Sequence, residues 1–202
     1  MALGLKRGVV ELADHDPEWA NIAAQTIERL WSIFGSCSSG GIVADIQHVG
    51  STAIKGIKAK PIIDIAVAVD DFTEVENLIP VLEAEGFLWR KRENEQRVLF
   101  AIGDYANPDG LVTHFIHVMK PESNEWFKCV GFRDYLNRHI SAAKEYEALK
   151  VKLANDNPID PGREKYVAGK NDFIMKILAD AHTWELLREI SQYNAFKKIE
   201  PT

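Results

Sequence analysis

A glycine–serine turn followed by an acid on an apolar strand is the part of this sequence best suited to chemistry. Gly50 and Ser51 lie between two predicted strands, and Asp64 lies within the apolar run Ile62–Val69. Glycine permits a tight turn close to a ligand, and the N–H groups of such turns bind phosphate oxygens. A carboxylate on a buried strand has to be paired, protonated or bound to a metal. The stretch therefore predicts a phosphate and metal site, or a plain turn beside an ion pair of Asp64 with Lys60 or an arginine.

The loop around this turn adds polar groups and positive charge. His48 and Thr52 flank the turn, and the loop carries three lysines: Lys55, Lys58 and Lys60. Lysine is a common phosphate ligand because its ammonium group is a compact positive charge. We therefore count Thr52 and Lys60 among the predicted phosphate-binding residues.

Two histidines lie on a later candidate strand at 111–119. His114 and His117 are three positions apart, so a regular strand points them to opposite faces of the sheet. If this strand neighbours the Asp64 strand, His117, or less readily His114, lies near Asp64 as a metal ligand or general base. The alternative for each is a histidine that is hydrogen-bonded within the sheet.

The second part of the chain supplies further cations. Arg133 lies in a polar helical segment and has the planar fork that binds phosphate, although an ion pair with a neighbouring acid is the alternative. Lys170 follows Tyr166 at a spacing that Tyr146 and Lys150 repeat. In such a pair the tyrosine stacks on a base and the lysine reaches a phosphate, or the pair holds the helices together.

Strands that alternate with helices must position these groups in a first unit, residues 1–120. Apolar and β-branched runs predict strands at 9–12, 42–49, 62–69, 87–91, 97–102 and 111–119. The last two are expected to form a hairpin, and the run at 62–69 a central strand. Helices are predicted after Asp16 and after Asp71, each capped by the aspartate and ended by Gly35 or Gly86.

Residues 121–202 are predicted to be a helical unit that packs on the sheet within one compact domain. Helices are expected at 123–138, with Ser123 as the predicted cap, and at 141–154 and 163–181. Thr183 either caps a last helix or lies inside a longer one. The predicted fold class is therefore α+β: a mixed β-sheet flanked by helices and followed by a C-terminal helical unit.

The composition predicts a soluble cytoplasmic protein. The 202 residues include 24 Lys+Arg and 30 Asp+Glu, a net charge of −6, which argues against an extended nucleic-acid surface but not against a local basic pocket. No apolar run approaches the roughly 18 residues of a membrane span, and no signal peptide is recognisable. Two cysteines without a motif, Cys37 and Cys129, are typical of a reduced compartment. The oligomeric state is not indicated.

Several separated motifs, taken in order, resemble those of the GrpB family. They are His48-Val49-Gly50-Ser51-Thr52-Ala53, Ala59-Lys60-Pro61-Ile62-Ile63-Asp64-Ile65, His114-Phe115-Ile116-His117-Val118, Phe132-Arg133-Asp134-Tyr135-Leu136, and Tyr166 with Lys170. The resemblance runs from about Val9 to Ala181 and implies a nucleotidyltransferase-like fold.

This resemblance also implies a nucleoside triphosphate bound with Mg²⁺ or Mn²⁺, and transfer of a nucleotidyl or phosphoryl group to an acceptor. In that superfamily a Gly-Ser turn holds the phosphates, and two or three carboxylates hold two divalent ions. Asp64 and His117 then become the catalytic and metal-binding candidates. The nucleotide- or phosphate-binding candidates are His48, Gly50, Ser51, Thr52, Lys60, Arg133 and Lys170.

One position departs from the superfamily pattern. Ala66 stands where the second acid is expected, because residues 64 and 66 share a strand face. One carboxylate suits a single Mg²⁺ that keeps its waters and uses substrate phosphates. Asp45, early on the preceding strand, is a poor substitute. The sequence therefore leaves open an enzyme, a binding or sensor protein for a nucleotide or another phosphorylated metabolite, and a non-catalytic partner of other proteins.

Overall fold

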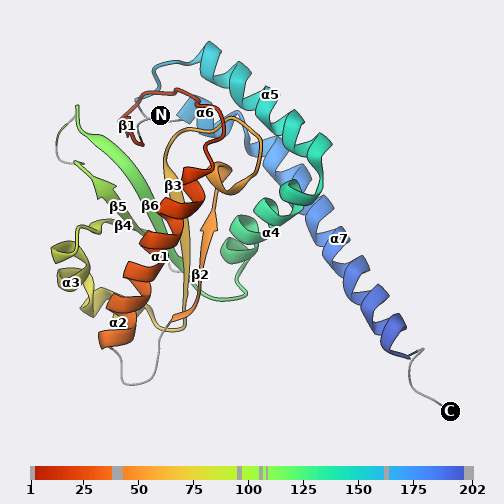
Figure 1. The fold of residues 1–202 in the computed structure, drawn as a ribbon, viewed down its shortest axis with the longest axis horizontal. Helices are drawn as coiled ribbons and strands as arrows, with labels where there is room; N and C mark the ends of the chain where they lie inside the picture. Colours follow the sequence, from red (N-terminus) through yellow and green to blue (C-terminus); the bar gives the residue numbers. More distant parts are fainter. Residues whose placement is uncertain are drawn as a thin grey trace.

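The computed structural model describes residues 3–37, 43–94, 97–104, 107, 109–161 and 164–197. These residues form a mixed six-stranded sheet in the order β2-β3-β6-β5-β4, with β1 paired to β6 off this path (Figure 1). The strands are β1 Leu5–Lys6, β2 Val43–Val49, β3 Ile63–Val69, β4 Leu88–Asn94, β5 Arg97–Gly103 and β6 Leu111–Met119. Strands β3 and β6 are parallel and all other pairs are antiparallel. The predicted central strand and hairpin are confirmed.

The helices surround this sheet. They are α1 Glu18–Cys37, α2 Phe72–Asn77, α3 Ile79–Ala84, α4 Asn124–Arg138, α5 Ile140–Asp156, α6 Glu164–Ala168 and α7 Asn171–Lys197, with a 3-10 turn, η1, at Ser51–Ala53. The Asp71 carboxylate accepts from the N–H of Thr73 at the start of α2, and Ser123 Oγ accepts from the N–H of Trp126 at the start of α4. Both predicted caps are therefore confirmed.

Several predicted boundaries are wrong, each for a local reason. The helix expected after Asp71 is divided at Leu78, because Pro80 has no N–H to continue the hydrogen-bond ladder. Helix α1 continues past Gly35 to Cys37, since a glycine in the last turn is tolerated. The segment 9–12 forms no strand; Val9 and Ala13 instead make isolated bridges to Ile159 and Ala59.

The helix expected at 163–181 is two helices, α6 and α7, which are separated at Gly169 and Lys170. Helix α7 then continues beyond 181, and Thr183 lies inside it, where its hydroxyl donates to the carbonyl of Ala179. Residues 38–42, which follow α1, and Arg163, the expected start of the helix at 163–181, lie outside the described residues. The break before α7 matters for function because it places Lys170 in a turn and not on a helix face.

One face of the sheet is closed by the first three helices. Alternate residues of β3 and β6 on this face form the main apolar core with α1, α2 and α3: Ile63, Ile65, Val67, Ile116 and Val118. Figure 1 shows α1 lying across this face. The burial of these side chains supplies most of the hydrophobic stabilisation of the sheet.

The opposite face is only partly covered. Helix α4 packs there through Trp126, Cys129 and Val130 against Ala66 and Met119. Helix α7 packs against α4 and then extends away from the sheet (Figure 1). The uncovered part of this face carries the polar groups of the candidate site.

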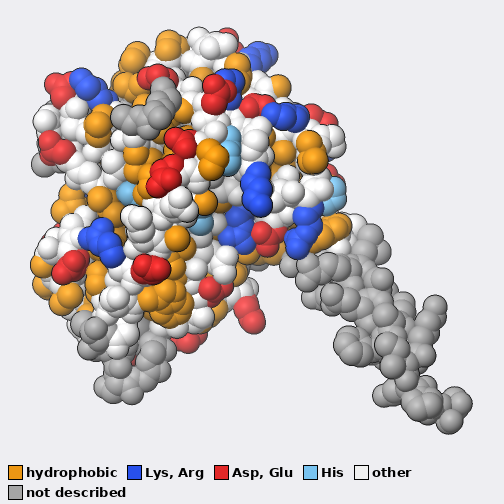
Figure 2. Space-filling model, in the orientation of Figure 1, with side chains coloured by type: hydrophobic (Ala, Val, Ile, Leu, Met, Phe, Trp, Pro, Cys, Tyr) orange, Lys and Arg blue, Asp and Glu red, His pale blue; other side chains and the backbone are white. Residues whose placement is uncertain are grey.

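The surface mixes charge signs on the face seen in Figure 2, where acidic, basic and apolar side chains are interspersed. None of the described helices is both long enough and apolar enough to cross a membrane.

Candidate functional site

The Gly50 turn and Asp64 are held against each other by the pairing of β2 with β3. Val49, the last residue of β2, pairs with Asp64, so the chain turns directly beside the carboxylate. Gly50 has a φ of 71°, and a Cβ there would lie 2.9 Å from the Cβ of Asp64 and closer still to a carboxylate oxygen. Only glycine fits both the backbone conformation and this close approach. The turn therefore lies directly against the Asp64 side chain.

His117 lies beside Asp64 because β3 and β6 are neighbours. The register places Ala66 next to His117, and residues 64 and 66 share a face. His117 Nε2 lies 3.1 Å from Asp64 Oδ1. The condition that the two strands are neighbours is met, and His117 is the histidine that faces Asp64.

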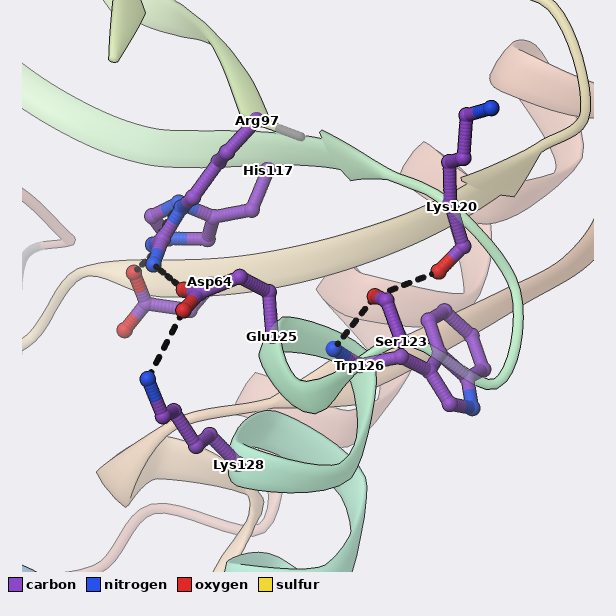
Figure 3. A network of polar contacts seen from close by, with 8 residues as sticks. All are labelled: Asp64, Arg97, His117, Lys120, Ser123, Glu125, Trp126 and Lys128. Atoms are coloured by element: carbon purple, nitrogen blue, oxygen red, sulfur yellow. Dashed lines mark hydrogen bonds and ion pairs between the residues drawn. The ribbon is translucent and has the colours of Figure 1, made fainter. Parts of the chain in front are cut away.

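The polar contacts continue beyond His117 to residues that the sequence analysis did not include. Arg97 Nη2 lies 2.6 Å from His117 Nδ1. Arg97 Nη1 donates to Glu125 Oε2 at 3.2 Å. Glu125 Oε1 accepts from Lys128 at 2.8 Å (Figure 3). Arg97 begins β5 and Glu125 lies in the first turn of α4. Neither has a distinctive sequence signal, because their proximity depends on strand order and helix docking.

His114 faces the closed side of the sheet. It is 7% exposed, and its Nε2 lies 3.2 Å from the hydroxyl of Thr26 in α1. Burial lowers its pKa to about 4, and the positive charge of Arg29 acts in the same direction. Its contacts are those of a histidine hydrogen-bonded within the core.

His48 and Thr52 support the turn from the same closed side. His48 pairs with Ile65, which points into the core, and its Nε2 lies 3.0 Å from Thr52 Oγ1. Burial lowers the pKa of His48 to about 4, although Asp64 opposes this shift. Thr52 is buried. Neither residue lines the cavity beside Asp64, so their predicted direct contact with phosphate gains no support.

A cavity of about 210 Å³ opens beside Asp64 between the sheet and α6. It is lined by Ser51, Lys60, Ile62, Asp64, Phe115, Tyr166, Val167 and Lys170. Four of the predicted site residues thus meet in one place although they come from four segments of the chain. The lining combines apolar side chains with charged ones, as in many small-molecule sites.

Two lysines of this cavity each contact the same aromatic ring. The Nζ atoms of Lys60 and Lys170 lie 4.1 Å and 4.4 Å from the centroid of the Tyr166 ring. Within the described part of the chain, the Lys170 ammonium has no carboxylate or carbonyl partner. Burial lowers the pKa of Lys170 to about 8, although the Asp64 charge raises it. The cavity therefore holds a positive charge that an anion would stabilise.

The similar pair of Tyr146 and Lys150 has a structural position. Lys150 is 1% exposed and donates to the carbonyl of Lys58. Burial and the charge of Lys170 lower the pKa of Lys150 to about 7. The Tyr146 hydroxyl accepts from Ser51 Oγ at 3.4 Å, and burial raises its pKa to about 12. This pair holds the lysine-rich loop and the turn against α5, which is the second of the two predicted alternatives.

Arg133 ties α4 to β2. Its Nη1 donates to the Gln47 side chain at 2.9 Å and to the carbonyl of His48 at 2.7 Å, and its Nε donates to Asp134 at 2.8 Å. The guanidinium is not among the groups that line the cavity. The contacts are those of the ion-pair alternative, and the predicted role in phosphate binding gains no support.

A centre with two divalent ions does not fit these residues. Ala66 offers no ligand, and Asp45 pairs with Ala68, four residues along β3 from Asp64, or about 13 Å at the usual strand rise. Among the described residues, no group of three His, Cys, Asp or Glu side chains is placed to hold a metal ion. Neither Ala66 nor Asp45 therefore supplies a second carboxylate beside Asp64.

The fold and the turn beside Asp64 define a protein of the nucleotidyltransferase-like fold. The structure is similar to the crystal structure of the conserved protein GrpB from Enterococcus faecalis, with a TM-score of 0.76, 25% identity, and coverage of 87% of this chain and 99% of that one. A family model described as GrpB protein matches residues 9–180. This chain belongs to the GrpB family.

Two curated relatives extend the comparison. The glutamate-rich protein GrpB of Alkalihalophilus pseudofirmus is 36% identical over 179 residues, which cover 87% of this chain and 98% of that protein. A dephospho-CoA kinase of Mycolicibacterium paratuberculosis is 31% identical over 209 aligned positions, covering 89% of this chain. The chain spans about half, 48%, of that longer protein.

Proposed function

We propose that this protein binds a phosphorylated small molecule, in the first place a nucleotide, in the cavity beside Asp64. The observation that supports the proposal is the pair of lysines over the Tyr166 ring, with Lys170 lacking an anionic partner in the described structure. A phosphate group would supply the missing negative charge at little cost, because the ammonium groups are already held in place. The apolar lining beside them suits a base or another uncharged part of the ligand.

Each side chain of the cavity has a distinct role in this proposal. Lys60 and Lys170 bind the phosphate oxygens. The Ser51 hydroxyl, which donates to Tyr146 in the unliganded structure, turns to donate to the phosphate instead. Asp64 accepts from a hydroxyl or amino group of the ligand. Tyr166 keeps both lysines close to the ligand by cation–π attraction.

One divalent ion is compatible with this arrangement. A single Mg²⁺ or Mn²⁺ would take Asp64 as its protein ligand, with phosphate oxygens and water in its other positions. When bound, it would neutralise phosphate charge. The site lacks the second carboxylate that two-metal activation needs. Binding or sensing is therefore better supported than nucleotidyl transfer. The relative named as a dephospho-CoA kinase adds dephospho-CoA to the ligands worth testing.

Ligand-induced shifts in melting temperature test the proposal. ATP, ADP, dephospho-CoA and pyrophosphate would each be titrated, with and without Mg²⁺, against the wild type, Asp64→Asn and Lys170→Met. A ligand at a hundred times its Kd stabilises the native state by about 2.7 kcal/mol, which is easily measured. Lys176→Met is the matched control, because Lys176 is an exposed lysine on α7.

We expect at least one compound to raise the melting temperature of the wild type and the control, and to have a much weaker effect on Lys170→Met. Loss of a Mg²⁺-dependent part in Asp64→Asn would support the single-ion arrangement. An equal shift in Lys170→Met, or no shift with any compound, would contradict the proposal.

A further inference from the structure

Asp64 is one end of a chain of polar and charged side chains that runs from the cavity to helix α4. The contacts are Asp64 to His117, His117 to Arg97, Arg97 to Glu125, and Glu125 to Lys128 (Figure 3). Arg97 and Glu125 are mostly buried, with 22% and 18% of their side chains exposed. Partial burial strengthens such contacts, since water competes less for the charged groups.

The donor and acceptor roles in this chain follow from the chemistry of arginine. A guanidinium carries only N–H donors, so at the 2.6 Å contact His117 Nδ1 must be the acceptor. A neutral imidazole that accepts at Nδ1 carries its proton on Nε2. His117 Nε2 therefore donates to Asp64 Oδ1, which accepts as a carboxylate.

We propose that Arg97, held by Glu125, is a positioning residue that fixes His117 as the Nε2–H tautomer and thereby orients the Asp64 carboxylate toward the ligand cavity. The tautomer follows from contacts within the protein alone. The consequence for ligands rests on the proposed function, because it assumes that Asp64 contacts what the cavity binds.

Glu125 is well placed to hold Arg97. It lies in the first turn of α4, where the helix dipole favours a negative charge, and Ser123 caps the same helix. Hydrogen bonds from Lys128 and Arg97 hold the pKa of Glu125 below its usual range, so it remains an acceptor. Arg97 is therefore fixed from one side by a carboxylate and directed toward His117 on the other.

This arrangement changes the role of His117. A metal ligand or general base needs a free lone pair on a ring nitrogen. In the proposed tautomer the Nδ1 lone pair accepts from Arg97, and Nε2 carries the proton given to Asp64. His117 then orients Asp64 and neither binds a metal nor removes a proton while the network is intact.

The tautomer is measurable by NMR on the unliganded protein labelled with ¹⁵N-histidine. At pH 8, two-bond ¹H–¹⁵N correlations distinguish a protonated nitrogen from an accepting one in each ring. We expect the wild type to show His117 with the proton on Nε2. A proton on Nδ1, or on both nitrogens, would overturn the proposal.

Variants of Arg97 test its part in this arrangement. Arg97→Met removes the donor to Nδ1, so we expect a mixture of tautomers. Arg92→Met is the matched control, because Arg92 lies on the adjacent strand β4 and pairs with Glu76 instead of with a histidine. Retention of the pure Nε2–H form in Arg97→Met would overturn the positioning role. If that variant does not fold, Glu125→Gln is measured instead, with a partial shift toward the mixture expected.

Binding of ATP provides the second readout. We expect Arg97→Met to bind ATP about tenfold more weakly than the wild type, the usual scale for one charge-assisted hydrogen bond, with Arg92→Met unchanged. Equal affinity in Arg97→Met and the wild type would contradict the orientation of Asp64 for the ligand. If the wild type itself does not bind ATP while the tautomer is as expected, the ATP form of the proposed function fails and the assignment of Arg97 stands.

Discussion

The two histidines of β6 occupy opposite faces of one strand and have entirely different surroundings. His114 points into the core under α1, where its ring contacts the hydroxyls of Thr26 and Thr113. His117 points to the partly open face, where it links Asp64 to Arg97. The same side chain therefore has a structural role on the closed face and a place in the candidate site on the other.

The two faces of the sheet differ in the same way. The closed face is covered by three helices and buries mostly apolar side chains. The open face combines a close approach at Gly50 with charged groups that retain partial exposure. We expect stability to depend mainly on the first face and ligand binding mainly on the second, and the following predictions test that division.

Acid should destabilise the closed face first. Burial lowers the pKa values of His48 and His114 to about 4, so between pH 6.5 and 4 the unfolded chain binds more protons than the native protein. The free energy of unfolding should therefore fall as the pH falls through this window, by about 3 kcal/mol for each histidine. Urea unfolding of the wild type and His114→Gln measures this; the variant should lose roughly half of the histidine contribution.

His182→Gln is the control for that series, because His182 is exposed on α7. Its pH dependence should match the wild type. If His114→Gln matched it as well, the closed face would not be the acid-sensitive one.

Truncation of an isoleucine should cost more stability on the closed face than beside the cavity. Ile65 is fully buried on the closed face, whereas Ile62 lines the cavity. We expect Ile65→Ala to lower the free energy of unfolding by about 4 kcal/mol, and Ile62→Ala by about 2 kcal/mol, because the side chain beside an open cavity leaves less new empty space. Chemical denaturation gives both values. A larger loss in Ile62→Ala than in Ile65→Ala would contradict the proposed division between the two faces.

Gly50→Ala should affect both the free energy of unfolding and ligand binding. The substitution combines an unfavourable φ with a collision against the Asp64 carboxylate, so we expect a loss of about 2–3 kcal/mol in the free energy of unfolding. Gly56→Ala is the matched control, because Gly56 has a φ of 72° with no atom within 4 Å of the added Cβ. It should cost only about 1 kcal/mol. Equal costs would show that the contact with Asp64 has no energetic consequence.

The smallest expected effect concerns the pH dependence of ligand binding. Since the pKa of Lys170 is lowered to about 8, its ammonium loses its proton as the pH rises from 7 to 9. Affinity for ATP should therefore fall by about tenfold over this range. Isothermal titration calorimetry of the wild type and Lys170→Met checks this, and the variant should show a much flatter profile. A wild-type profile as flat as that of the variant would remove Lys170 from the binding site.

Local patterns predicted the elements of this fold well where the signal was strong. The apolar run at 62–69, the hairpin at 97–119 and the caps at Asp71 and Ser123 each depend on neighbouring residues alone. Boundaries were less predictable. The helix after Asp71 is divided near Leu78, where Pro80 has no N–H to continue the ladder, and the helix expected at 163–181 is broken before Asn171.

The candidate site was only partly predictable, because part of it depends on strand order and helix docking. Asp64 was conspicuous because a carboxylate on an apolar strand requires an explanation. Arg97 and Glu125 were not, since an arginine at a strand start and a glutamate in a first helical turn are ordinary. Only the order of β3, β6 and β5 and the docking of α4 bring them to His117.

The sequence by itself determined the alternation of strand faces, and therefore that His114 and His117 diverge and that Ala66 leaves the second acid missing. Side-chain direction on a strand is a local property with a period of two. The tertiary structure alone decided which histidine meets Asp64, that Lys60 and Lys170 share the Tyr166 ring, and that Arg133 is used to join α4 to β2. Those contacts depend on how distant elements pack, which no local pattern encodes.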